Sequence, residues 1–198
     1  AQRAADAAEA KFRDFFDNAP IGKSMTLPDG RLSAVNPAFC RMLGYSAEEL
    51  ARTNFKDITH PDDLEESVRC VRSLLAGEAS TWTMDKRYIA RDGRIVRTHV
   101  TTCLARDLEG RPLHFVTHVE DVSEQHRLAE SLNREQQNFR ALWEHMAAAS
   151  CLDEVVYRDG CAVDYRVQDI NPAFERLIGV DRARAVGALA SDLYGTPI

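Results

Sequence analysis

The stretch Asn36-Pro37-Ala38-Phe39-Cys40-Arg41-Met42-Leu43-Gly44 decides the fold, because it marks both ends of a helix. Asparagine is a preferred N-cap residue and proline is favoured at the first helical position, so the helix begins at Asn36-Pro37. Gly44 ends it, since glycine adopts the left-handed conformation that closes many helices. The buried side of this helix is predicted to consist of Phe39, Met42 and Leu43. Directly afterwards, Ser46-Ala47-Glu48-Glu49 has the pattern of a capping box and predicts a second short helix.

Two strands are predicted before this helical region and three after it. Residues 21–27 and 31–36 are short strand candidates on either side of a Pro-Asp-Gly turn. A longer helix begins at Asp62 or Asp63 and ends at Gly77, where the apolar period changes from helical to two. Three antiparallel strands follow, at residues 82–90, 94–106 and 113–119. This order predicts an α+β fold, a five-stranded antiparallel sheet with short helices on one face.

A long amphipathic helix is predicted over residues 121–146. Its apolar positions follow steps of three, four and seven, as expected for the a/d seam of a coiled coil: Leu128, Leu132, Phe139, Leu142 and Met146. The partner that we expect is the same helix of a second chain, and the alternative is a single helix packed on its own domain. Asp121 and Ser123 lie at its start, where a carboxylate or hydroxyl group can bind N–H groups that lack helical partners.

The front half of the pattern occurs twice. Asn36-Pro37-Ala38-Phe39 recurs as Asn171-Pro172-Ala173-Phe174, but the sequence ends before any counterpart of the long helix or of the last three strands. Because the first residue is not Met, we expect a piece of a longer protein. The predicted parts are an N-terminal flanking helix at 1–16, a first domain at 17–124, a linker helix at 125–146 and the front half of a second domain at 147–198.

Composition argues against several classes of partner. The chain has 25 Lys and Arg against 31 Asp and Glu, a net charge of −6, and no basic block, which disfavours nucleic acid. No apolar run approaches the about 20 residues of a membrane span, and no signal peptide is found. The five cysteines are an odd number without Cys-x-x-Cys spacing. A disulfide framework and a zinc site are therefore disfavoured, and a reducing cytoplasm is expected.

Catalytic and metal-binding patterns are not found either. No Gly-x-Ser-x-Gly, phosphate loop or His-Glu-x-x-His is present. His60 lies beside Asp62 and Asp63, but a loop that enters a helix capped by an aspartate explains this cluster better than acid–base chemistry. His114 and His118 lie on a predicted strand, where four residues span about 13 Å, so they share a face and cannot share a metal. We predict no catalytic residue and no metal site.

A small-ligand site is predicted in the core, on the face of the 94–106 strand that carries Val96, Thr98, Val100, Thr102 and Leu104. Thr98 and Thr102 are unusual in a dry core and can orient a ligand. Equally, threonine is a common strand residue whose hydroxyl bonds its neighbours. The predicted ligand-binding residues are Phe39, Met42, Phe55, Thr98, Val100 and Thr102.

Several motifs together resemble a PAS domain with a C-terminal PAC motif. They are residues 36–50, Asp57-Ile58-Thr59-His60-Pro61-Asp62-Asp63-Leu64, Lys86-Arg87-Tyr88-Ile89-Ala90-Arg91-Asp92-Gly93 and Asp121-Val122-Ser123-Glu124. The resemblance runs through nearly all of residues 12–125. Residues 164–174 are similar to a variant of the same family from bacterial signalling proteins, which implies a tandem pair with a truncated second copy.

The resemblance implies five antiparallel strands flanked by short helices, in a non-catalytic module that senses, dimerises and relays a signal. Such modules precede a histidine kinase, a diguanylate cyclase or phosphodiesterase, or a chemoreceptor output. The resemblance therefore implies a homodimer through the flanking helices, an output domain of the same polypeptide and a small-molecule ligand. It assigns the Asp-Val-Ser motif, with Asp121 and Ser123, to signal coupling.

The alternative function is a haem- or flavin-bearing redox or gas sensor. Light-sensing relatives carry a reactive cysteine where this chain has Phe55, so the flavin–thiol adduct cannot form there. Haem-binding relatives use a histidine on the long helix, and residues 63–76 contain none. The sequence therefore predicts no particular cofactor.

Overall fold

A computed structural model of the protein describes residues 2–195, without the side chains of residues 2, 4–6, 8, 9 and 194. It divides the chain into two compact units, Ala1–Leu128 and Ala129–Ile198, and each is described by itself. Residues 1 and 196–198, which the sequence analysis assigns to the flanking helix and to the second domain, lie outside the described residues.

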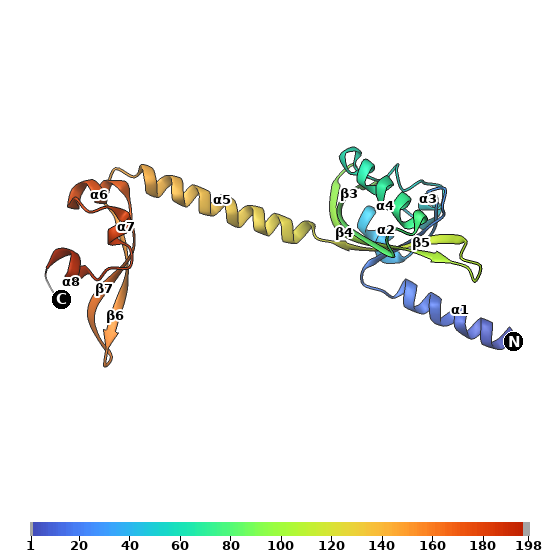
Figure 1. Cartoon of the computed structure of the whole chain (residues 1–198), viewed down its shortest axis with the longest axis horizontal. Helices are drawn as coiled ribbons and strands as arrows, with labels where there is room; N and C mark the ends of the chain where they lie inside the picture. Colours follow the sequence, from blue (N-terminus) through green and yellow to red (C-terminus); the bar gives the residue numbers. More distant parts are fainter. Residues whose placement is uncertain (1, 196–198) are drawn as a thin grey trace. The chain divides into compact units, whose positions relative to one another are not determined.

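The first unit is built on the predicted five-stranded antiparallel sheet, with strand order β2-β1-β5-β4-β3 (Figure 1). The strands are β1 (Gly22–Thr26), β2 (Leu32–Val35), β3 (Thr81–Ile89), β4 (Ile95–Arg106) and β5 (Pro112–Asp121). The pairing of β1 with β5, which sets Gly22 opposite Val119, joins the two ends of the unit in one sheet. The fold predicted from the sequence is confirmed, with strand ends shifted by one or two residues.

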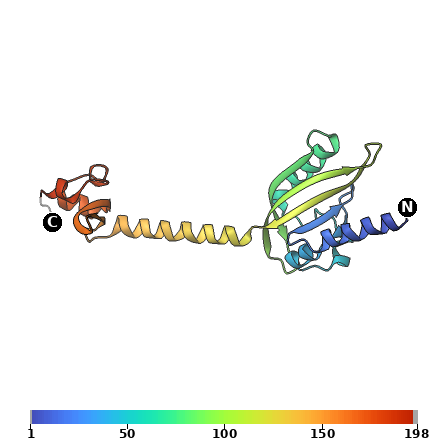
Figure 2. The same ribbon diagram turned by 90° about the horizontal axis from the view of Figure 1, so that it is seen from below.

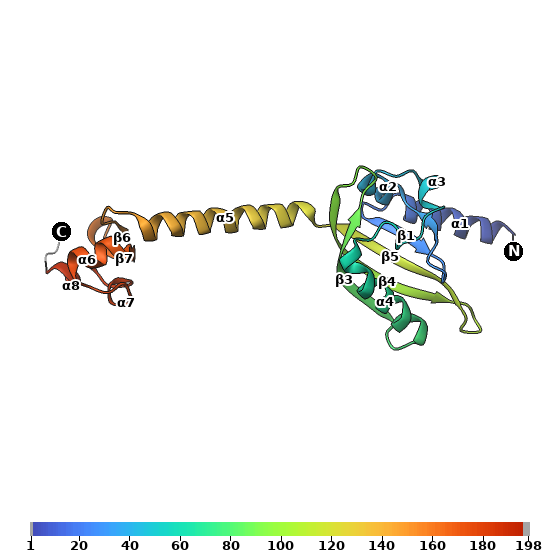
Figure 3. The ribbon, with the colours of Figure 1, turned by 90° about the horizontal axis from the view of Figure 1, so that it is seen from above.

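Short helices cover one face of this sheet (Figure 3). They are α2 (Pro37–Leu43), α3 (Ala47–Leu50), the 3₁₀ helix η1 (Pro61–Asp63) and α4 (Leu64–Ala76), and α1 (Gln2–Asp17) precedes the sheet. The predicted caps of α2 and α3 are present. Asn36 accepts the Phe39 N–H, Gly44 has a φ of 74°, and Ser46 and Glu49 form a capping box. The core beneath the helices contains the fully buried side chains of Leu43, Leu50, Val96 and Val119.

The start of α4 differs from the expectation that an aspartate caps it. The Asp63 side chain makes no cap hydrogen bond. Its Oδ2 instead accepts the backbone N–H of Arg87 at 2.7 Å, and its Oδ1 accepts from the Arg87 guanidinium at 2.7 Å. The cap bond of η1 comes from His60, whose Nδ1 accepts the Asp62 N–H at 3.3 Å. The carboxylate of Asp63 is therefore bonded to Arg87 of β3, and His60 provides the cap of η1.

The same loop lies along the outer side of β3. The His60 N–H donates to the Arg87 carbonyl at 2.9 Å, and the Ile89 N–H donates to the Ile58 carbonyl at 2.8 Å. Together with the bonds of Asp63, they pair with the outward-facing backbone groups in the second half of β3, one of the two outermost strands of the sheet.

The predicted long helix is α5 (Ser123–His145), 23 residues in one continuous run (Figure 2). The second unit contains the hairpin β6 (Cys151–Arg158) and β7 (Cys161–Ile170), followed by α6 (Pro172–Ile178), α7 (Arg182–Ala185) and α8 (Ala190–Tyr194). Helix α6 repeats the construction of α2: the Asn171 side chain accepts the Phe174 N–H, and Gly179 ends the helix in the left-handed region.

Candidate functional site

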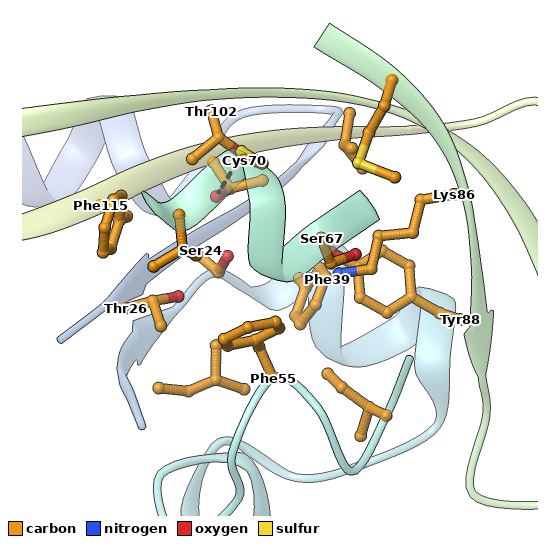
Figure 4. Close-up of a pocket in the computed structure, with 16 residues that line it drawn as sticks. Ser24, Thr26, Phe39, Phe55, Ser67, Cys70, Lys86, Tyr88, Thr102 and Phe115 are labelled. Carbon is orange, nitrogen blue, oxygen red and sulfur yellow. Dashed lines mark hydrogen bonds between the residues drawn. The ribbon is translucent and has the colours of Figure 1, made fainter. Parts of the chain in front are cut away.

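A cavity of about 50 Å³ lies between the sheet and the helices of the first unit (Figure 4). This volume is several times the about 10–15 Å³ that one water molecule needs. Most of its wall is apolar or aromatic: Leu32, Phe39, Phe55, Ile58, Val71, Met84, Tyr88, Val100 and Phe115. The polar part of its lining is Ser24, Thr26, Ser67, Cys70, Lys86, Thr102 and Thr117. An apolar cavity with a few converging polar groups is the usual form of a small-ligand site.

Four of the six residues predicted to bind a ligand line this cavity: Phe39, Phe55, Val100 and Thr102. They come from α2, from the loop before η1 and from β4. The hydroxyls of Thr102 and Thr117 lie 3.1 Å apart and bond each other across β4 and β5. A ligand at this end of the cavity would therefore meet a hydroxyl pair.

The other two predicted residues, Thr98 and Met42, do not line it. Thr98 is buried on the same face of β4, but its hydroxyl donates to the carbonyl of Lys86 at 2.8 Å and is used within the sheet. Met42 is half-buried and packs against the main core. Their ligand-binding role stays a prediction, and their positions favour a structural one.

Lys86 is the charged residue among the lining residues that the sequence analysis missed. It lies on β3 between Met84 and Tyr88, and all three residues are buried. Alternation along the strand predicts this orientation, since residues two apart share a face. The Lys86 Nζ lies 4.6 Å from the centroid of the Tyr88 ring and 5.2 Å from that of Phe55. These are cation–π contacts, which stabilise an ammonium group away from water.

The electrostatic state of the cavity is set by this lysine. Burial lowers the pKa of Lys86 to about 8, so the ammonium form still dominates at neutral pH. Burial raises the pKa of the Cys70 thiol to about 11 and also raises the pKa of Tyr88. Both of these groups are therefore neutral at pH 7. Lys86 is the one charged side chain among the described residues that line the cavity.

Helix α4 contributes a polar group without a hydrogen-bond partner. Ser67 is 5% exposed, and its hydroxyl has no hydrogen-bond partner within the described chain. Figure 4 shows the Lys86 side chain extending from β3 into the cavity that Ser67 also lines. A buried hydroxyl without a partner is uncommon, because it loses its bonds to water and gains none in exchange.

The two residues predicted to couple the sheet to the helix lie at the start of α5. The Asp121 Oδ1 accepts the N–H of Ser123 at 2.9 Å. The Ser123 hydroxyl accepts the N–H of Arg97 on β4 at 3.0 Å, and the Val122 N–H donates to the Arg97 carbonyl at 2.9 Å. The start of the helix is therefore attached to β4 as well as to β5, an attachment that the sequence analysis did not include.

One row of residues crosses three strands between the cavity and α5. Lys86 of β3 lies opposite Thr98 of β4, and Thr98 lies opposite Asp121 of β5. The Thr98 hydroxyl bonds Lys86, and the Asp121 carboxylate bonds the first residue of α5. This row, Lys86–Thr98–Asp121, runs from the wall of the cavity to the start of α5.

Among the side chains that the structure describes, there is no cluster of three or more potential metal ligands. None of the helices in the described part of the chain is both long and apolar enough to cross a membrane.

Comparisons with known proteins place these features in a family. The model of the PAS fold matches residues 10–122. The probable diguanylate cyclase DgcE of Escherichia coli (strain K12) is 35% identical over 127 residues, which cover 64% of this chain and 11% of that protein. The sensor histidine kinase TmoS of Ectopseudomonas mendocina is 24% identical over 131 residues, 66% of this chain and 14% of that protein. The chain thus corresponds to a small part of the length of these relatives.

Solved structures share the fold. The PAS domain of a protein from Colwellia psychrerythraea superimposes with a TM-score of 0.55 at 18% identity, over 59% of this chain and 98% of that one. At this identity the likeness concerns the fold alone.

Proposed function

Because the chain belongs to the PAS family, we propose that its first unit senses a small ligand in the core cavity and relays the signal through α5. The output domain lies on the same polypeptide, outside this chain, and the module itself is not an enzyme. The observation that carries this proposal is the Lys86–Thr98–Asp121 row, which runs from the wall of the cavity to the start of α5. Similarity to a probable diguanylate cyclase and a sensor histidine kinase supports an output domain of one of these two kinds.

The relay follows from how the row is bonded. A ligand that moves the Lys86 side chain also acts on the Lys86 backbone. The carbonyl of that backbone accepts a hydrogen bond from the Thr98 hydroxyl. Arg97, the residue before Thr98 on β4, donates its backbone N–H to the Ser123 hydroxyl at the start of α5. A ligand shifts such a system only by its difference in affinity for the two states, and a few kcal/mol is sufficient.

The junction is tested by Asp121→Ala. The variant loses the bond to the Ser123 N–H, and losing a cap costs about 1 kcal/mol. That is small against the about 5–15 kcal/mol of a domain, so the sheet stays folded, but it shifts a two-state helix arrangement about fivefold. We expect nearly unchanged melting and an altered output of the full-length protein. Asp92→Ala is the matched control, because Asp92 makes the same kind of bond, to the Arg94 N–H, in a hairpin away from α5. A variant that melts slightly earlier and responds normally contradicts the coupling role.

We also propose that the chain forms a homodimer through its flanking helices. The seam of α5 supports this, because Leu128, Leu132, Phe139 and Leu142 are between 58% and 69% exposed in the single chain. Phe12 and Phe15 of α1 are exposed as well. These exposures favour the dimer over a helix packed on its own domain.

Sedimentation equilibrium tests the dimer. Leu132→Glu places a charge in the seam, and we expect it to produce a monomer, whereas Asn133→Glu, which leaves the seam residues in place, keeps the wild-type association state. A wild-type chain that stays monomeric at high micromolar concentration contradicts the proposal.

The second unit is proposed to be the front half of a second PAS copy. The equal construction of α2 and α6, each with an asparagine cap, an initial proline and a closing glycine, supports this tandem arrangement. Strands β3 to β5 with the Asp-Val-Ser exit are proposed as the PAC motif. Free thiols at all five cysteines support a reducing cytoplasm as the location.

The alternative of a haem- or flavin-bearing sensor gains no support from the site. A cavity of about 50 Å³ is far smaller than the about 300–1,000 Å³ of pockets for drug-sized ligands. The Phe55 ring forms part of the cavity wall, and Phe55 occupies the position at which light-sensing relatives carry the reactive cysteine. A ligand of a few non-hydrogen atoms fits this space better.

A further inference from the structure

Two polar groups in the cavity lack partners, and they face the same space. The Lys86 Nζ makes no hydrogen bond to a described residue, and the rings of Tyr88 and Phe55 lie 4.6 and 5.2 Å from it. The Ser67 hydroxyl is also without a partner. A buried cation without a counter-ion is costly, and a buried hydroxyl without a bond adds to that cost. Both costs are removed by one ligand that brings an anionic acceptor.

No protein carboxylate supplies that acceptor. The described residues that line the cavity include no Asp or Glu. Asp63 is close enough to affect Lys86 electrostatically, but its oxygens are engaged by Arg87, with bonds of 2.7 and 3.1 Å to the guanidinium and 2.7 Å to the backbone N–H. The positive charge of Lys86 is therefore left for a ligand.

The surroundings restrict the ligand further. One ammonium and one hydroxyl suit a singly charged carboxylate, whereas a phosphate dianion needs more donors than this site offers. The remaining wall near Lys86 is made of Phe39, Phe55 and Tyr88, which fits a short alkyl chain. The small volume excludes long chains.

We propose that the cavity binds a small monocarboxylate, with its carboxylate on the Lys86 Nζ and the Ser67 hydroxyl and its alkyl chain against the aromatic wall. This inference deepens the proposed function and rests on it, because it names the chemical class of the signal. The two aromatic rings hold the ammonium group in place before the ligand enters, which lowers the ordering cost of binding.

The test compares matched acids and amides on the whole chain. Acetate, propionate and butyrate are titrated against acetamide, propionamide and butyramide, with heat of binding and the amide NMR signal of Ser123 as readouts. We expect at least one of the acids to bind at least about tenfold more tightly than its amide, since breaking a buried charge pair costs at least that much. Lys86→Met is expected to abolish this preference, and Ser67→Ala to weaken acid binding by a smaller factor.

The controls keep the result interpretable. Lys56→Met removes an exposed lysine and should bind as the wild type does. Lys86→Gln, which keeps a polar group without the charge, should lose the acid preference as well. It takes the place of Lys86→Met if the methionine variant misfolds. Equal binding of acid and amide, acid binding that survives both Lys86 variants, or no binding of any of the three acids overturns the inference.

The two proposals fail in different ways. If an acid binds through Lys86 while the Ser123 signal stays fixed, the ligand class stands and the relay through α5 fails. If an amide binds without dependence on Lys86 and moves the Ser123 signal, the relay stands and the carboxylate fails.

Discussion

Asn36→Ala is expected to remove about 4 kcal/mol from the free energy of unfolding of the first unit, because four hydrogen bonds, three of them buried and one partly buried, depend on this side chain. The Asn36 Oδ1 accepts the N–H groups of Lys23 at 2.8 Å and Phe39 at 2.9 Å. Its Nδ2 donates to the carbonyls of Phe16 at 3.1 Å and Ile21 at 2.9 Å. One side chain, itself fully buried, thus joins the end of α1, strand β1 and helix α2.

Alanine leaves all four backbone groups without a partner, and each such buried group costs about 1–3 kcal/mol unless water reaches it. The loss is a large part of the about 5–15 kcal/mol that a domain has. Urea denaturation followed by circular dichroism measures it. Asn133→Ala, at an exposed position of α5, is the control and should change little. A loss below about 1 kcal/mol would mean that the backbone groups find other partners.

The second large effect concerns Lys86 and pH. Lys86→Met is expected to raise the free energy of unfolding at neutral pH by up to about 3 kcal/mol, because methionine fills similar space without a charge. In the folded chain burial lowers the pKa of Lys86 to about 8, below the ordinary value of 10.5. Between these two values the unfolded chain binds the additional proton, so wild-type stability rises with pH there. The advantage of the variant is therefore complete below about pH 8 and is lost as the pH approaches about 10.5.

The measurement is urea denaturation of both proteins at about pH 7 and about pH 10, and the quantity compared is the difference between them. Cys70 and Tyr88 line the same cavity, and burial raises the pKa of the Cys70 thiol to about 11 and also raises the pKa of Tyr88. The charge of Lys86 lowers the pKa of Cys70, so its removal raises that pKa further, and both groups stay mostly neutral at about pH 10 in the two folded proteins. Lys56→Met, which removes an exposed lysine, is the control and should change the free energy of unfolding little. A difference that is the same at both pH values would mean that Lys86 is solvated in the folded chain.

Local sequence signals predicted the framework well. The caps at Asn36, Gly44 and Ser46 depend on residues within four positions, and the structure contains them as predicted. The strands follow from periods of two between turn residues, and β3, β4 and β5 are present within two residues of the predicted ends. Such features are visible in one dimension because their partners are neighbours along the chain.

Partners distant in sequence could not be predicted in the same way. Aspartate is a residue type that often caps helices, but the Asp63 carboxylate instead accepts hydrogen bonds from Arg87, 24 positions later. Thr98 and Thr102 are equivalent by alternation, and only the register with β3 decides that the Thr98 hydroxyl bonds Lys86. Lys86 itself was missed because a charged residue on a strand is ordinarily expected to face water. Alternation with Met84 and Tyr88 was the available signal.

The loop bonds along β3 have a consequence for association with other chains. β2 and β3 are the outermost strands, and an outermost strand with free N–H and C=O groups is a template for aggregation. Ile58, His60 and Asp63 occupy those groups along the second half of β3. At the β3 edge, the strand groups left for pairing with another chain lie in residues 81–85, where the charge of Asp85 opposes strand addition. Asp63 therefore also blocks the pairing of another strand with the Arg87 N–H at this edge.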